Sequence, residues 1–128
     1  MILVDTGVII GYQRTGDPKL DALFRSLPVG ICGVTRAEIL HGARDSANRH
    51  NLLILLNTFH QVSIPDSIWD LTGDHLAALR AKGITVPFAD VVIATLAIQN
   101  DIELWTRDAH FTMIRIVLPV LKLFVEPP

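Results

Sequence analysis

Short apolar runs alternate along the chain with longer stretches in which apolar residues recur at helical spacing. The runs predict buried strands, since they are too short for helices and contain few polar residues. The predicted strands span residues 1–4, 29–34, 61–64, 103–106 and 122–125. The predicted helices span residues 8–12, 17–27, 35–44, 47–59, 67–82, 87–99 and 110–114. Strands separated by helices predict parallel pairing with right-handed crossovers.

Four carboxylates follow or border these apolar segments. Asp5 follows the first strand, Asp108 follows the fourth, and Glu38 lies in the helix after the second. Because ligands bind at the carboxyl ends of parallel strands, we expect these three acids at one edge of the sheet. Asp90 joins them only if helix 87–99 begins at that edge, which the pattern alone does not decide. Charges beside a core need compensation, and a divalent cation is the simplest shared compensator.

Each acid also has a structural interpretation of its own. Asp5 and Asp108 could cap the helices that follow them. Thr35 and Glu38 have the spacing of a capping box. Asp90, in the first turn of its helix, could favour the helix dipole. These interpretations need a separate reason for every acid, whereas one metal site explains all four.

Composition narrows the class of protein. The 128 residues fit a single domain, half of them are hydrophobic, and the net charge is −2. The chain has neither a basic field nor a polybasic run, so its charge gives no sign of a simple DNA-binding module. The lone Cys32 excludes an intrachain disulfide, and neither a signal peptide nor a membrane span is predicted. The cytoplasm is therefore the expected location.

The other polar candidates are weaker. The five histidines lack the spacing of a zinc site. His75 is expected half-buried with its hydrogen bonds satisfied. His110 could contact substrate, although a surface position is favoured. Arg107 could touch a phosphate, although a solvated side chain is favoured.

Four stretches carry a resemblance to a known family. They are Ile2-Leu3-Val4-Asp5-Thr6, Thr35-Arg36-Ala37-Glu38-Ile39, Pro87-Phe88-Ala89-Asp90-Val91-Val92-Ile93-Ala94 and Thr106-Arg107-Asp108-Ala109-His110-Phe111. In this order and spacing, the chain resembles the PIN-domain family and, within it, the VapC-type toxin ribonucleases. The resemblance covers nearly the whole chain.

The resemblance implies a single PIN-like domain over residues 1–128, a three-layer α/β/α fold with a central, mainly parallel twisted sheet. It also implies a Mg²⁺ or Mn²⁺ pocket in which Asp5 and Asp90 are the principal ligands. Glu38 and Asp108 complete the implied pocket, and Thr106 supports it as a further catalytic residue. The same resemblance places the start of the Asp90 helix at the shared edge.

The implied activity is metal-dependent cleavage of RNA by the toxin of a toxin–antitoxin pair. The implied partners are an RNA substrate, a small cognate antitoxin and a second copy of the chain. Helices 17–27 and 47–59 are candidate dimer surfaces. A non-catalytic PIN-like interaction module is the alternative. A haloacid-dehalogenase-like phosphatase would need an acid at Gly7, and a receiver domain would need an acceptor acid directly after the third strand.

Overall fold

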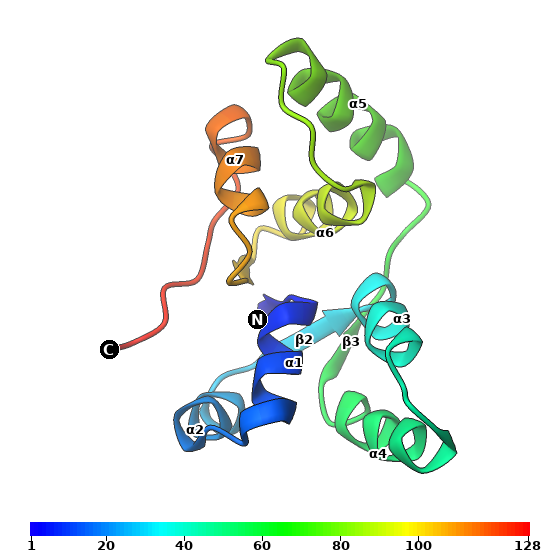
Figure 1. Ribbon diagram of the computed structural model, residues 1–128. Helices are drawn as coiled ribbons and strands as arrows, with labels where there is room; N and C mark the ends of the chain where they lie inside the picture. Colours follow the sequence, from blue (N-terminus) through cyan, green and yellow to red (C-terminus); the bar gives the residue numbers. More distant parts are fainter.

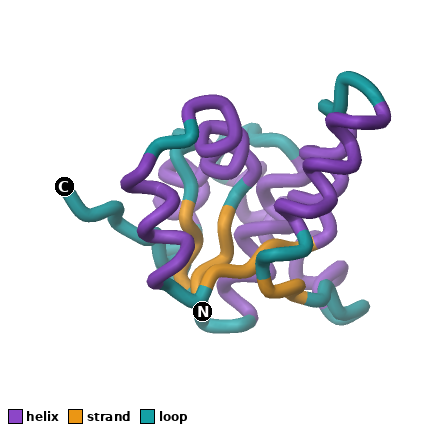
Figure 2. The backbone as a smooth tube through the Cα atoms, turned by 90° about the horizontal axis from the view of Figure 1, so that it is seen from below, coloured by secondary structure: helices purple, strands orange, loops and turns teal.

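A parallel sheet forms the centre of the molecule. The computed structural model describes residues 1–128. Its strands are β1 (Ile2–Val4), β2 (Val29–Cys32), β3 (His60–Val62) and β4 (Glu103–Trp105). All pairs are parallel, in the order β3-β2-β1-β4. Figure 2 shows the strands running side by side between helices. The predicted parallel pairing is confirmed.

Helices cover both faces of this sheet, so they form the two outer layers of an α/β/α fold (Figure 1). One layer contains α1 (Thr6–Thr15), α2 (Pro18–Ser26), α3 (Gly33–His41) and α4 (Ser46–Leu56). The other contains α5 (Ile68–Ala81), α6 (Phe88–Gln99) and α7 (His110–Val117). No helix has the length and apolar character that crossing a membrane requires.

Alternating residues of the strands divide the core between the two layers. Leu3 packs in the cluster with α5, α6 and α7, whereas Ile2 and Val4 pack in the cluster with α1 to α4. In β4, Leu104 and Trp105 divide in the same way. Both faces of the short strands are therefore buried, which explains why their sequences are continuously apolar.

The predicted strand at 122–125 is wrong. Only one bridge forms there, between Leu104 and Leu123. Two backbone hydrogen bonds hold it, from the Leu104 N–H to Lys122 and from the Phe124 N–H to Leu104. Leu121 and Phe124 still pack into the core clusters. The segment is apolar because it covers the core, and this burial needs no extended ladder.

Two predicted helices are longer than expected. The helix predicted at 8–12 begins at Thr6 and continues to Thr15, where Gly16 ends it with a positive φ of 58°. The helix predicted at 110–114 continues to Val117. The long helices predicted at 67–82 and 87–99 match α5 and α6 within a residue at each end.

Candidate metal centre

The four acid-bearing segments meet at one edge of the sheet. The chain order runs from β1 to β2 and β3 on one side, while β4 lies on the other side of β1. The strand order therefore reverses between β1 and β4, where α/β folds bind ligands. Asp5 follows β1 and Asp108 lies just past β4. Because α6 leads directly into β4, its first turn, with Asp90, begins at the same edge.

Asp5 is the most deeply buried of the four acids, with 5% of its surface exposed. It occupies the N-cap position of α1, yet its side chain makes no capping hydrogen bond. Instead its Oδ2 accepts a hydrogen bond from Thr106 Oγ1 at 2.9 Å. Burial raises the pKa of Asp5 above its ordinary value, and the nearby Glu38 and Asp108 carboxylates add to this rise. The hydrogen bond from Thr106 opposes the rise.

Asp90 is buried in the first turn of α6. Burial raises its pKa to about 6, and the negative charges of Asp5 and Asp108 act in the same direction. His110 partly offsets the shift. A carboxylate that only favoured a helix dipole would sit in solvent and would not resist ionisation. The raised pKa therefore fits a site that lacks positive charge.

Glu38 lies on the exposed face of α3 and accepts a hydrogen bond from Thr6 Oγ1 at 2.9 Å. The capping box with Thr35 does not form. The pattern requires Thr35 as the N-cap, but the N-cap of α3 is Cys32, three residues earlier, and the helix begins at Gly33. The Thr35 hydroxyl is buried inside the helix without a hydrogen-bond partner. Glu38 therefore has no capping role. Its carboxylate is bound to Thr6, the residue after Asp5, and its charge raises the pKa of Asp5.

Asp108 and His110 form the other wall of the centre. Asp108 Oδ1 accepts a hydrogen bond from the His110 backbone N–H at 2.9 Å, so it supports the first turn of α7. The Nδ1 atom of His110 lies 3.1 Å from Asp108 Oδ1 and 3.1 Å from Asp90 Oδ2. His110 was expected on the surface, but its ring is half-buried between two carboxylates. His75 agrees with its prediction, being half-buried 2.8 Å from Thr95 Oγ1.

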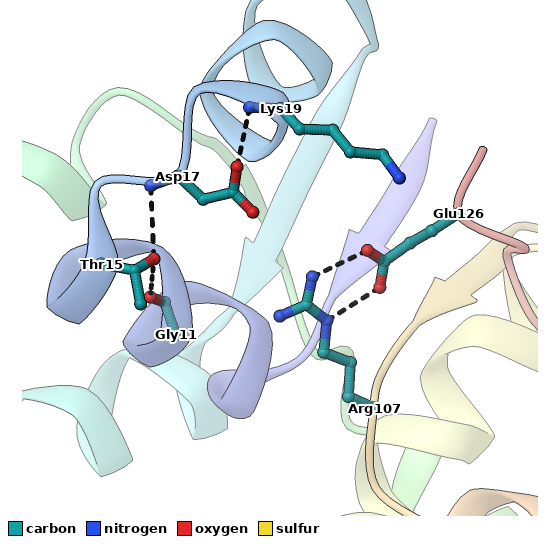
Figure 3. A network of polar contacts seen from close by, with 6 residues as sticks. All are labelled: Gly11, Thr15, Asp17, Lys19, Arg107 and Glu126. Atoms are coloured by element: carbon teal, nitrogen blue, oxygen red, sulfur yellow. Dashed lines mark hydrogen bonds and ion pairs between the residues drawn. The ribbon is translucent and has the colours of Figure 1, made fainter. Parts of the chain in front are cut away.

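The guanidinium of Arg107 faces the carboxylate of Glu126 (Figure 3). Its guanidinium donates two hydrogen bonds to Glu126, at 2.7 and 2.8 Å. The side chain is therefore held in an ion pair and is not simply solvated, as the sequence favoured. The bidentate pair ties the C-terminal segment to the loop between Thr106 and Asp108. Thr106 stiffens the same loop, because its hydroxyl also accepts the Asp108 N–H at 3.0 Å.

Two residues at the centre, Thr6 and His110, were not among the predicted site residues. The sequence contains one usable signal for His110. Phe111 and Ile114 are spaced as the buried face of a short helix, and both are fully buried. His110 precedes Phe111 and therefore had to lie at the border of that face, next to the loop of Asp108. Thr6 carries no comparable signal.

The donor set fits a hard divalent cation. Carboxylate oxygens dominate it, and Asp90, Asp108 and His110 each offer one ligand atom within 4.8 Å of the others. Burial and mutual repulsion disfavour the charged forms of Asp5 and Asp90. A bound cation would relieve this repulsion. Mg²⁺ and Mn²⁺ prefer such oxygen ligands, whereas zinc prefers Cys and His.

Comparison with known proteins defines the class of the chain. The PIN domain matches residues 2–116. The chain therefore belongs to the PIN-domain family, as the four motifs indicated.

Among curated relatives, it is 30% identical over 123 residues to ribonuclease VapC10 of Mycobacterium tuberculosis, covering 93% of this chain and 92% of that protein. It is 29% identical over 115 residues to ribonuclease VapC1 of Methanocaldococcus jannaschii, covering 89% and 81%.

Solved structures share the fold. VapBC2 from Rickettsia felis, bound to a DNA fragment from its promoter, matches with a TM-score of 0.83 and 21% identity over 97% of this chain and 98% of that one. VapC20 of Mycobacterium tuberculosis, a toxin that cleaves the sarcin-ricin loop, matches with a TM-score of 0.74 and 14% identity over 99% and 100%. Both agree with the three-layer fold.

Proposed function

We propose that this chain is a metal-dependent endoribonuclease and the toxin of a toxin–antitoxin pair. The observation that carries the proposal is the meeting of Asp5, Glu38, Asp90 and Asp108 at one sheet edge, with the pKa of Asp90 raised to about 6. The curated relatives named as ribonucleases support it. The whole chain acts as one PIN-like domain, and the cytoplasm is the compartment in which it would meet RNA.

The four acids hold the cation, and two threonines orient the acids. Asp5 and Asp90 are the principal ligands of Mg²⁺ or Mn²⁺, and Glu38 and Asp108 complete the pocket through water or a second ion. When bound, the cation supplies Lewis acidity, which lowers the pKa of an attacking water and polarises the phosphoryl oxygens. Thr106 holds the Asp5 carboxylate in one orientation through its 2.9 Å hydrogen bond. Thr6 does the same for Glu38.

The proposal is tested by cleavage of transfer, ribosomal and messenger RNAs with the purified chain. Cleavage is expected with Mg²⁺ or Mn²⁺, should stop in EDTA and should return when the ion is restored. A parallel preparation of Asp5→Asn controls for contaminating nucleases. Cleavage that persists in EDTA would contradict the metal site. Failure to cleave any RNA with either ion would favour the non-catalytic interaction module.

A cleft beside Glu38 is suited to the RNA backbone. It has a volume of about 630 Å³, and its lining includes Arg14, Arg44 and Asn48. Both arginines are exposed, and the ion pairs of the structure use other residues. Guanidinium groups with no carboxylate partner are available to phosphate oxygens. These two positive charges also offset the repulsion between RNA and the acidic centre.

Replacing Arg14 or Arg44 with alanine should raise KM about tenfold, since a charge-assisted hydrogen bond contributes about 1.5 kcal/mol. The kcat value should stay within a few-fold, because neither arginine forms an ion pair with an acid of the centre. Steady-state cleavage at several salt concentrations measures both constants. Arg80→Ala, an exposed arginine on α5 in the opposite layer, is the matched control. A fall in kcat with an unchanged KM would contradict this placement of the RNA.

A cognate antitoxin is the proposed regulator, and VapBC structures with the same fold support it. A basic side chain of that protein would enter the acidic centre, pair with Asp5 and Asp90 and compete with the cation.

We also propose a homodimer. Of the two candidate surfaces, α4 is favoured, because its Ile54 is 55% exposed whereas Leu20 of α2 is buried within the subunit.

A further inference from the structure

His110 occupies an unusual place in the acidic centre. It is the first residue of α7, and its backbone N–H is fixed by Asp108. Its ring nitrogen Nδ1 lies 3.1 Å from oxygens of both Asp90 and Asp108. These acids come from different elements, one from α6 and one from the loop after β4. The ring is therefore aimed at the point where the two carboxylates converge.

A protonated His110 could serve as a simple counter-ion for this pair of acids. The same geometry also fits a coordination sphere. With metal–ligand bonds of about 2.1 Å, adjacent ligands of an octahedral ion lie about 3.0 Å apart and opposite ones about 4.2 Å apart. The two distances of 3.1 Å match adjacent positions. The carboxylate oxygens of Asp90 and Asp108 lie within 4.8 Å of each other, so a small movement of either side chain brings them to the distance of opposite ligands.

We propose that His110 ligates the catalytic cation through Nδ1, which makes the site a mixed nitrogen and oxygen centre that favours Mn²⁺ over Mg²⁺. This inference rests on the proposed metal-dependent function. Mg²⁺ binds nitrogen poorly, whereas first-row transition ions accept imidazole readily. For Nδ1 to coordinate, its lone pair must be free and the ring proton must lie on Nε2. The side chain is 41% exposed, so Nε2 can reach solvent.

The test uses the full chain loaded with Mn²⁺ alone. Electron spin-echo spectroscopy of bound Mn²⁺ detects the coupling of a ligating imidazole nitrogen. Nitrogen modulation is expected in the unmodified chain, should disappear in His110→Gln and should persist in His60→Gln. His60 is the matched control, because it is exposed at the start of β3, at the opposite end of the strands. The Mn²⁺ dissociation constant should rise about tenfold in His110→Gln, with little change for Mg²⁺.

The possible outcomes separate this inference from the proposed function. If Mn²⁺ binds to the unmodified chain without nitrogen modulation, His110 is only a counter-ion, and the ribonuclease proposal stands. If Mn²⁺ does not bind at all, the metal site itself fails, and both proposals are overturned. Circular dichroism of His110→Gln checks that the variant is folded. The spectrum of the unmodified chain decides the question independently of any variant.

Discussion

Replacing Asp90 with asparagine is expected to abolish RNA cleavage while raising the thermal midpoint of the metal-free protein. Cleavage should fall by about a thousandfold or more, because a catalytic cation supplies several kcal/mol of transition-state stabilisation. Asparagine keeps the size of the side chain and removes only its negative charge. Asp5→Asn should behave in the same way, since the pKa of Asp5 is also raised by burial.

The rise in stability follows from the sign of the pKa shift. Burial and the charges of Asp5 and Asp108 raise the pKa of Asp90 from 3.8 to about 6. The charged form therefore weakens the folded state at neutral pH, by at most about 3 kcal/mol. Neighbouring acids titrate together, so the realised gain is smaller. A rise of a few degrees in the midpoint is expected.

Asp70→Asn is the matched control for this experiment. Asp70 lies in the first turn of α5, as Asp90 lies in the first turn of α6. Asp70 is exposed, so its charge can favour the helix dipole without a burial cost. Its replacement should leave cleavage unchanged and slightly lower the midpoint. If both variants lower the midpoint equally and both cleave RNA, Asp90 is a helix-dipole residue and the metal-ligand assignment is wrong.

The positions of Asp5 and Asp108 could be predicted because they depend on topology alone. Asp5 directly follows β1 and Asp108 lies three residues past the end of β4, and the ends of parallel strands meet at one edge. Asp90 was different, since its place depends on the direction in which its helix runs. The structure decides this direction, because α6 leads directly into β4 and begins at the edge where the strands end. Here family resemblance supplied what the residue pattern lacked.

Long-range pairing of polar side chains accounts for most of what the sequence did not predict. The pairing of Arg107 with Glu126 joins residues 19 positions apart across a loop and a terminal segment. The hydrogen bond between Thr6 and Glu38 joins residues 32 positions apart. Neither pair leaves a periodic pattern, because each depends on how finished elements pack. The prediction at 122–125 failed for a related reason. Its apolar residues pack on the core, and a strand was wrongly inferred from them.

The early start of α1 was missed for a local reason. Thr6 and Gly7 are poor helix formers, so the prediction began at Val8. Asp5 nevertheless stands in an extended N-cap conformation, with a ψ of 159°. Burial of Val8 and Ile9 then holds the first turn against the core. Packing of the apolar face overrides the weak intrinsic preference of the two residues.

Stability and metal binding should change in opposite directions as pH rises through the pKa of Asp90. In the folded chain this pKa is raised to about 6, from 3.8 in the unfolded chain. The folded state therefore holds this proton more tightly than the unfolded state does. The resulting stability is fully present below about pH 3.8 and is lost as pH rises to about 6. Between pH 5 and 7 the metal-free midpoint of the unmodified chain should fall relative to Asp90→Asn.

A cation requires the ionised carboxylate, so its effect has the opposite sign. The increase in midpoint caused by Mg²⁺ or Mn²⁺ should be small at pH 5 and should grow until it levels off above about pH 6, where Asp90 is ionised. Below that value, the cation must displace one proton from Asp90, which weakens cation affinity by about tenfold for each pH unit. Protonation of Asp5 acts in the same direction, since its pKa is raised too.

Thermal melts from pH 5 to 8, in EDTA and in saturating Mn²⁺ at constant ionic strength, measure both trends. The quantity to compare is the gap between the two midpoints at each pH. It should widen with pH in the unmodified chain and stay small in Asp90→Asn. Carboxyls with lowered pKa values, such as Asp21 and Glu126, lose their contributions at lower pH and affect both proteins equally. A gap that is independent of pH would mean that the cation does not bind at Asp90, and the site would then have to be assigned to other carboxylates.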